Sequence, residues 1–287
     1  ELFYMAVLAF GENALADAAR FAAAAAAREP DGLLYAAAAT YLARLERAGK
    51  SSVYLSPEGF GAFVRAGGNV PLYAATSAAL RNVYARTGAQ RLLDIGVGDG
   101  LALLPALTDG ITELDLIEPS AAMLASTCQQ LDERGRQHRA FNGTLQEFAA
   151  QSTGRWDIAE ATFSLQSLMP EERAPMLAWL RARCRRLLIA EFDAPEFAEQ
   201  FAPARVRYVA EHFERGLGEY PENRELVAQG FLMPVMFGYF DRTAARTNYE
   251  QPIAAWAGQL RAAGFAQVTT TELYPYWWAP AYLIEAS

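Results

Sequence analysis

Residues 91–104 read RLLDIGVGDGLALL, which places glycines at 96, 98 and 100 directly after a short apolar run. Each glycine inside a helix or strand costs roughly 0.5 to 1 kcal/mol relative to alanine, so this cluster indicates a turn that something approaches closely. Leu92, Leu93 and Ile95 predict a buried parallel strand before the turn, and residues 101–107 predict a helix after it. In an open α/β sheet such a turn lies at the carboxyl edge, where nucleotide-like ligands bind.

Two common glycine-rich loops fit this stretch poorly. A phosphate-binding P-loop ends in Gly-Lys-Ser or Gly-Lys-Thr, and neither Lys nor a hydroxyl residue follows these glycines. A dinucleotide fingerprint needs a glycine where this chain has Leu101. The remaining pattern, Asp94 followed by Gly-x-Gly-x-Gly, resembles the first motif of class I S-adenosylmethionine-dependent methyltransferases. The alternative is a tight turn that happens to be rich in glycine.

A second test of this resemblance is an acidic residue at the end of the next strand. Residues 112–120 read TELDLIEPS, an apolar alternation that ends in Glu118, 22 residues after Gly96. A carboxylate at this place can accept hydrogen bonds from both ribose hydroxyls, while the glycine turn admits the rest of the ligand. The alternative is a solvated acid at a strand end, which is common at strand-to-helix junctions.

Strand-like and helix-like segments alternate after residue 90, which predicts a parallel sheet with helices on both faces. The apolar runs at 266–275 and 277–286 leave no room for a helix between them and predict an antiparallel hairpin. The resemblance implies an α/β fold with a Rossmann-like seven-stranded sheet in the order 3-2-1-4-5-7-6, the last strand antiparallel. The five earlier strands are expected at 91–96, 112–118, 139–143, 156–162 and 186–192.

The resemblance covers the methyltransferase domain at residues 69–287, and residues 1–68 are expected to form an N-terminal helical cap. Within 69–287, residues 193–250 form an insertion after strand five, which we expect to act as a lid because it leaves from the carboxyl edge. The cap is also a candidate surface for a homodimer. Its alanine-rich stretches predict helices at about 2–28, 33–48 and 56–66, with breaks at 29–32 and 49–52.

Charge and composition favour a small-molecule partner. The net charge of -8 argues against nucleic acid, whose binding depends on Lys and Arg neutralising phosphates. The apolar stretch at 1–10 is too short for a membrane span and lacks the positive flank of a signal peptide. Two cysteines, Cys128 and Cys184, fit a reducing, cytoplasmic compartment. The chain does not begin with Met, so residues are expected to precede Glu1.

The resemblance also implies which residues hold the cofactor, S-adenosyl-L-methionine. The three glycines, Gly96, Gly98 and Gly100, would lie beneath its methionine and sugar, with Asp94 near the ammonium group and Glu118 at the ribose.

The adenine end of the cofactor is less well matched. Met123 would pack on the adenine face, unless it is an ordinary core methionine. Where relatives often carry an acid for the adenine amino group, this chain has Thr144, which leaves recognition to the Leu145 backbone or to Gln146. Thr162 and Phe163, at the end of the fourth strand, are expected beside the cofactor.

Three residues are candidates for the catalytic base. His212 lies at the border of an apolar stripe on the inserted helix, where an imidazole can take a proton near neutral pH. Glu191, at the end of strand five, and Tyr73 are the other candidates, and a reaction without any base also fits. No metal is expected, because His138 and His212 are 74 residues apart and no His and carboxylate cluster has ligand spacing.

Aromatic residues are frequent in the insertion and near the last strand, which suits a flat acceptor held by stacking. We therefore predict methyl transfer to a small aromatic metabolite of secondary metabolism, at oxygen, nitrogen or an electron-rich carbon such as an indole carbon. The alternative is a non-catalytic S-adenosylmethionine-binding protein with a regulatory or assembly role. The expected acceptor contacts are Tyr208, Phe237, Tyr239 and Trp277.

Overall fold

The computed structural model describes residues 1–50 and 56–287, and the chain divides into two compact units. The helical unit comprises Glu1–Val70 and Glu196–Arg246, and the sheet unit comprises Pro71–Pro195 and Thr247–Ser287. Part of the expected break at 49–52 lies outside the described residues. Within the described residues, no helix combines the length and apolarity that a membrane crossing requires.

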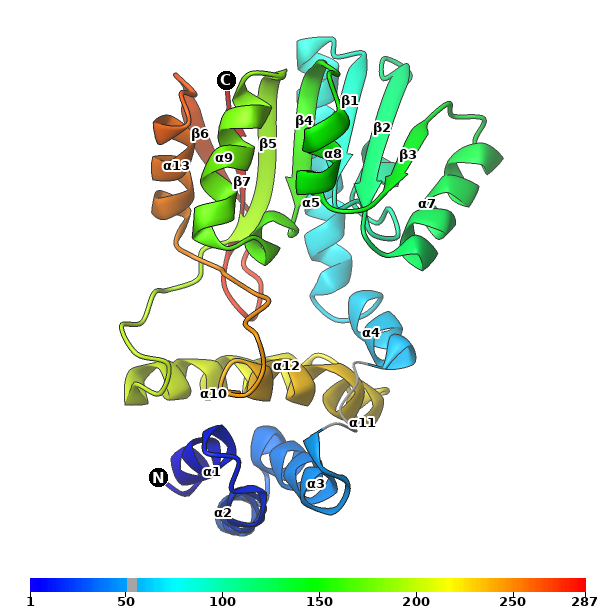
Figure 1. The fold of residues 1–287 in the computed structure, drawn as a ribbon. Helices are drawn as coiled ribbons and strands as arrows, with labels where there is room; N and C mark the ends of the chain where they lie inside the picture. Colours follow the sequence, from blue (N-terminus) through cyan, green and yellow to red (C-terminus); the bar gives the residue numbers. More distant parts are fainter. Residues whose placement is uncertain (51–55) are drawn as a thin grey trace. The chain divides into compact units, whose positions relative to one another are not determined.

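The sheet unit is built on a seven-stranded sheet in the order β3-β2-β1-β4-β5-β7-β6, as predicted (Figure 1). The pairs from β3 to β5 are parallel, whereas β7 runs antiparallel to both β5 and β6, which confirms the expected hairpin. The strands are β1 (Arg91–Ile95), β2 (Glu113–Glu118), β3 (Arg139–Asn142), β4 (Trp156–Thr162), β5 (Cys184–Phe192), β6 (Val268–Tyr274) and β7 (Ala281–Ala286).

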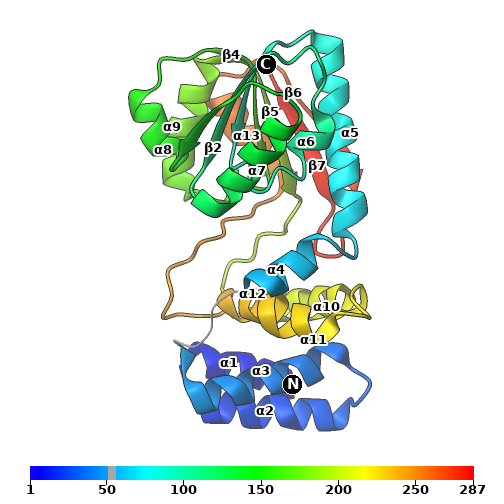
Figure 2. The same ribbon diagram turned by 90° about the vertical axis from the view of Figure 1, so that its right-hand side faces the viewer.

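Helices cover both faces of this sheet, and each face has its own hydrophobic core. Neighbouring residues of β1 point to opposite faces, so Leu92 joins one core and Leu93 the other. Figure 2 shows α8 and α9 on one side of the sheet and α5 on the other. The first core involves α5 (Asn69–Thr87), α6 (Leu103–Ala106) and α7 (Ala121–Glu133), and the second α8 (Leu145–Gln151), α9 (Pro170–Arg181) and α13 (Ile253–Ala262).

The helical unit joins the first 70 residues to the inserted segment. Glu214 of α10 accepts hydrogen bonds from the backbone N–H groups of Leu33 and Leu34, at 3.0 and 2.6 Å, and so caps the start of α3. The elements are α1 (Leu2–Gly11), α2 (Leu15–Arg28), α3 (Leu33–Ala48), α4 (Pro57–Val64), α10 (Pro203–Gly218), α11 (Arg224–Val227), the π-helix Ala228–Leu232 and α12 (Met233–Gly238).

The continuous helix expected at 2–28 is wrong. Two helices, α1 and α2, occupy this segment, and Asn13 between them adopts a left-handed conformation with φ of 60°. Asn tolerates this conformation better than most residues, and the preceding Gly11 is a poor helix former, so the chain turns there. The alanine content of α2 concealed this break because alanine favours a helix without marking where it ends.

Candidate functional site

The turn after β1 has a left-handed backbone at each of its three glycines. The φ angles are 73° at Gly96, 57° at Gly98 and 79° at Gly100. A Cβ atom on Gly96 would lie 2.5 Å from the Cβ of Ser164, and one on Gly100 would lie 2.7 Å from Leu104, so both glycines are needed for packing. A Cβ on Gly98 would meet nothing within 4 Å. Gly98 is therefore the point at which the bare backbone is open to a ligand.

Side chains from neighbouring elements hold this turn in place. The Thr127 hydroxyl of α7 donates to the Gly98 carbonyl at 2.8 Å, and the Ser164 hydroxyl donates to the Ile95 carbonyl at 2.6 Å. Sequence reasoning did not identify Thr127. Its signal was a polar residue on the face of α7 that carries Leu124 and Leu131, where it is fully buried.

Glu118, at the end of β2, is tied directly to the turn. Its Oε2 accepts from the Gly98 N–H at 2.9 Å and its Oε1 from the Ser120 N–H at 2.8 Å. Because each carboxylate oxygen can accept more than one hydrogen bond, Glu118 keeps acceptor capacity for a ligand's hydroxyl groups. The predicted pair of glycine turn and acid is thus one hydrogen-bonded unit.

The structure separates the residues that were expected near the adenine. Thr144 is the N-cap of α8 and exchanges hydrogen bonds with Glu147 in a capping box, which gives its side chain a structural role. The Leu145 side chain is buried in the core, so only its backbone can contact a ligand. Gln146 differs, because its buried Oε1 has no hydrogen-bond partner among the described residues. Met123 is half-buried in the first turn of α7 rather than in the core.

A continuous series of aromatic rings follows the ends of β4 and β5. Phe163 and Phe192 stack with their centroids 4.8 Å apart, and Phe192 stacks on Tyr276 at 5.3 Å. Tyr73 of α5 meets the edge of Phe163 at 6.0 Å, and Trp277 contacts Tyr276 at 5.2 Å. We call these five residues the aromatic row. Sequence reasoning named Tyr73, Phe163 and Trp277, but it did not place Phe192 and Tyr276 between them.

Phe163 also carries backbone strain. Its φ of 53° lies in the left-handed region, which is unfavourable for a bulky residue without a polar side chain. Such strain costs on the order of 1 to 3 kcal/mol and clusters at functional sites. The half-buried Thr162 comes directly before it, as the last residue of β4.

Glu191 and Tyr73 both hold protons at neutral pH. Burial raises the pKa of Glu191 to about 8, although its carboxyl accepts a hydrogen bond from the Gln166 N–H at 3.1 Å. Burial also raises the pKa of Tyr73 to about 12, and the negative charge of Asp99 adds to this. Both groups are therefore hydrogen-bond donors near pH 7, and neither is a base there.

His212 and Tyr208 lie in α10 of the helical unit, with their rings stacked 3.8 Å apart. The Nδ1 of His212 is 2.7 Å from the Tyr208 carbonyl oxygen, so Nδ1 carries the proton and donates it, and Nε2 has the lone pair. Burial holds the pKa of His212 below 6.5. The imidazole is thus neutral at pH 7, which is the state a base requires.

Phe237 does not have the surface position expected of an acceptor contact. Its side chain is fully buried in the helical unit, stacked on Tyr41 at 5.3 Å and packed against Phe10 at 4.9 Å. It is a core residue, because an apolar ring on a short helix is used first to close that unit. Tyr239 is half-buried and meets Phe213 edge-on at 6.3 Å.

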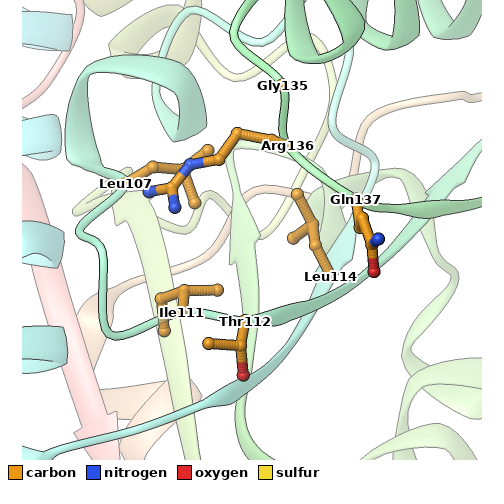
Figure 3. A pocket seen from close by; sticks show the side chains of 7 residues that line it. All are labelled: Leu107, Ile111, Thr112, Leu114, Gly135, Arg136 and Gln137. Carbon is orange, nitrogen blue, oxygen red and sulfur yellow. The ribbon is translucent and has the colours of Figure 1, made fainter.

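A small pocket of about 260 Å³ lies at the amino end of β2, opposite the end that carries Glu118 (Figure 3). Arg136 lines this pocket, but its guanidinium donates to the Thr108 carbonyl and lies 3.8 Å from Asp109. The guanidinium of Arg136 is thus already engaged by groups of the protein itself. In residues 1–50 and 56–287, no group of three or more His, Cys, Asp and Glu side chains is arranged to hold a metal ion.

Comparisons with known proteins identify the fold. No protein-family model matches the chain, and no curated protein matches it in sequence. The magnesium protoporphyrin IX methyltransferase of Synechocystis, solved with bound S-adenosylmethionine, is 16% identical, with a TM-score of 0.50 over 81% of this chain and 92% of its own. The 1,6-didemethyltoxoflavin-N1-methyltransferase of Burkholderia thailandensis is 18% identical, with a TM-score of 0.49 over 74% and 77%.

This chain spans only 54–55% of the length of several O-methyltransferases that it also matches. The likeness to the Synechocystis enzyme and the strand order together show that the chain has the class I methyltransferase fold.

Proposed function

We propose that this protein binds S-adenosylmethionine at the turn after β1 and transfers its methyl group to a small molecule. The observation that carries the proposal is the turn itself. Gly98 presents open, left-handed backbone, and its N–H is bonded to the acid at the end of the next strand, Glu118. The Synechocystis protein of the same fold holds S-adenosylmethionine, which supports the same cofactor here.

The described residues fit this cofactor at both ends of its nucleoside. Glu118 would accept from the ribose hydroxyls, in addition to the two backbone amides that it already binds. Gln146 would accept from the adenine amino group through Oε1, the buried atom that has no partner in the described chain. When bound, the cofactor supplies a methyl group activated by a sulfonium. The protein's part is then to align the acceptor with that methyl group.

The proposed acceptor is a flat, aromatic small molecule. The aromatic row offers stacked faces and edges at the ends of β4 and β5, and it includes the strained Phe163. Protonated Glu191 and Tyr73 can donate hydrogen bonds that orient such a molecule. The proposed target of the methyl group is an oxygen, a nitrogen or an electron-rich carbon of this molecule.

The base for the reaction is proposed to be His212, or no base is used. His212 is neutral at pH 7 and its Nε2 can take a proton, whereas Glu191 and Tyr73 are already protonated. An amine without a proton to lose, or an electron-rich ring carbon, can attack the methyl group before any proton leaves.

Four further assignments, on domains, assembly and location, belong to the same proposal. They are a helical cap at 1–68, a lid at 193–250, a homodimer formed through the cap and a cytoplasmic location. Cys128 and Cys184 are free thiols, which supports a reducing compartment. Sedimentation of the purified protein would test the dimer.

The experiment that tests the function uses S-adenosylmethionine with a labelled methyl group. The protein is incubated with phenolic, aniline and indole acceptors, and the label is followed by mass spectrometry. We expect transfer to at least one aromatic acceptor, and none to aliphatic alcohols and amines of similar size. Binding of the cofactor without transfer to any acceptor would favour the non-catalytic alternative.

A further inference from the structure

Two acidic side chains lie directly opposite each other in the centre of the sheet. Asp94 of β1 and Glu160 of β4 are register partners in a parallel strand pair, so their side chains leave the same face side by side. Their exposed fractions are 1% and 0%. Like charges opposite each other in a sheet are destabilising, and burial penalises each charge further. The pair is therefore stable only if it holds a proton.

A third buried group completes this cluster. The Tyr84 hydroxyl of α5 donates to Oε2 of Glu160, the register partner of Asp94. Among the residues that the structure describes, no donor reaches Oδ1 of Asp94 or Oε1 of Glu160. Two carboxyl groups can pair with each other only through a proton between them. Tyr84, Glu160 and Asp94 thus form a buried cluster, and Asp94 lies two residues before Gly96.

The charges around the pair favour its protonated form. Burial, followed by the charge of Glu160 and that of Glu118, raises the pKa of Asp94 well above its ordinary value. Burial raises the pKa of Glu160 to about 7, and the hydrogen bonds from Tyr84 and Asp94 oppose this rise. The groups facing the pair are thus Tyr84 from α5 and Glu118 from β2, and neither brings a positive charge.

We propose that Asp94 and Glu160 share a proton that the protein releases when the positively charged cofactor binds, with Tyr84 and Glu160 acting as positioning residues for Asp94. This proposal rests on the proposed function, because it needs a cation at the glycine turn. A positive charge there stabilises the ionised pair, so its proton leaves for the solvent. No covalent bond other than O–H changes. By linkage, the affinity for the cofactor rises with pH across the range in which the free pair loses this proton.

Glu160→Gln is the sharpest test, because the amide can replace the protonated carboxyl in shape and can donate to Asp94. In this variant the amide carries no charge and donates to Asp94, so no proton is shared between two carboxyl groups and Asp94 ionises at a lower pH than in the wild type. Asp94→Asn is the complementary variant, in which Glu160 is the one carboxyl of the pair left to titrate. Circular dichroism and thermal unfolding would establish that each variant folds.

Calorimetry of S-adenosylmethionine binding in phosphate and in Tris gives the number of protons released. We expect the wild type to release up to one proton more than Glu160→Gln near pH 6.5, and the same number near pH 8.5. The wild-type Kd should fall by up to about tenfold from pH 6 to pH 8, since a change of one in a pKa corresponds to a factor of ten in the binding constant. For Glu160→Gln the Kd should vary much less over this range, because protons of the cofactor's own amino group affect both proteins equally. Equal proton counts and equal pH profiles in the two proteins would overturn the proposal.

A titration without cofactor separates this proposal from the proposed function. Carboxyl carbons labelled with ¹³C report by NMR when Asp94 and Glu160 lose their protons in the free protein. We expect both to titrate well above ordinary carboxyl values. Ordinary values would overturn the shared proton even if the cofactor binds. Raised values together with no binding of S-adenosylmethionine would overturn the release step and the proposed function, while the shared proton stands.

Discussion

The glycine turn and the aromatic row lie at the same edge of one sheet, yet they offer a ligand different chemical groups. At the turn, the groups that can contact a ligand are backbone atoms and one carboxylate, Glu118, which is held by amides. In the row they are aromatic rings, next to a buried carboxyl, Glu191, which burial keeps protonated. The turn thus suits a ligand with hydroxyl groups and charge, whereas the row suits a flat, uncharged one.

This difference explains why the sequence predicts the cofactor side of the site better than the acceptor side. A backbone conformation needs glycine, so the cofactor side leaves a pattern in the sequence. A row of rings needs only aromatic side chains from elements far apart in the chain, and aromatic residues are common in cores. The comparison predicts that changes at the turn affect the cofactor alone, and that changes at Phe192 and Tyr276 of the row affect the acceptor alone.

The largest expected effect concerns Glu191, the buried and protonated carboxyl that precedes Phe192 of the aromatic row. The pKa of Glu191 is raised from 4.5 to about 8, so the folded protein keeps a proton that the unfolded chain loses between these values. This contribution to stability is complete below pH 4.5 and is lost as the pH rises to 8. It amounts to on the order of 5 kcal/mol, since each pH unit in this window is worth about 1.4 kcal/mol.

Chemical unfolding of the wild type and of Glu191→Gln at pH 5 and pH 8 measures this effect. The wild type should lose far more stability between the two pH values than the variant does. Glu171→Gln, at an exposed position of α9, is the control and should behave as the wild type. The same pH dependence in Glu191→Gln and wild type would mean that the folded protein does not hold Glu191 in its uncharged form.

The next effect separates backbone strain from ligand contact at the turn. Gly98 and Gly88 have similar φ angles, 57° and 62°, and neither has an atom within 4 Å of an added Cβ. Leucine at either position should destabilise the protein by a similar amount, about 1 to 2 kcal/mol. Only Gly98→Leu should also weaken binding of S-adenosylmethionine, by about a hundredfold or more, because its side chain fills the space that the backbone leaves open.

Calorimetry of S-adenosylmethionine binding to the two leucine variants checks this prediction. Unfolding curves establish that the two variants lose similar stability. Equal cofactor affinities in Gly98→Leu and Gly88→Leu would show that the open side of the turn does not face the cofactor.

His212 belongs neither to the glycine turn nor to the aromatic row, and His212→Ala tests whether it is the base. If His212 takes the acceptor's proton, turnover should fall by about a hundredfold or more while cofactor affinity is unchanged, as general bases commonly contribute that much. His138→Ala, which removes the other histidine, is the control. Turnover that stays at the wild-type level from pH 6 to pH 9 would leave the reaction without a base, since Tyr73 and Glu191 are protonated at neutral pH.

The smallest effect is expected from the middle of the aromatic row. Phe192→Leu keeps most of the apolar volume but removes the ring stacked between Phe163 and Tyr276. The KM for an aromatic acceptor should rise by up to about tenfold, because an aromatic contact is worth about 0.5 to 1.5 kcal/mol. The Kd of S-adenosylmethionine should not change. Phe148→Leu, which removes a half-buried ring packed against Trp156, is the matched control.

Steady-state kinetics with the acceptor found by the transfer assay would measure this change. An equal rise in KM for both variants would assign the effect to general loosening of the fold rather than to the row.

The sheet and the turn were predictable from the sequence because their signals are local. Short apolar runs separated by helices predict a parallel sheet, and the strand order followed from the resemblance that DIGVGDG and Glu118 carry. The single helix predicted at 2–28 was wrong because the alanine-rich composition outweighed a weak turn signal. That signal is Asn13, which is left-handed and lies between α1 and α2.

The rest depended on which distant residues become neighbours. Asp94 and Glu160 are 66 positions apart and become partners only through the register of β1 and β4. Phe192 and Tyr276 come from a strand end and a hairpin, and no local pattern indicates that their rings stack. Phe237 is an aromatic residue of the insertion, as an acceptor contact was expected to be. Only the packing of the helical unit shows that its side chain is buried.

The most direct test of the cofactor side is calorimetry with S-adenosylmethionine on Glu118→Ala. Glu118→Gln is the matched variant, because its amide can keep one acceptor while losing the charge. If Glu118 binds the ribose, Glu118→Ala should lose about 1.5 to 3 kcal/mol of binding free energy, as expected for hydrogen bonds to a charged group, and Glu118→Gln should lose less. Cofactor affinity unchanged from wild type in a correctly folded Glu118→Ala would contradict the account.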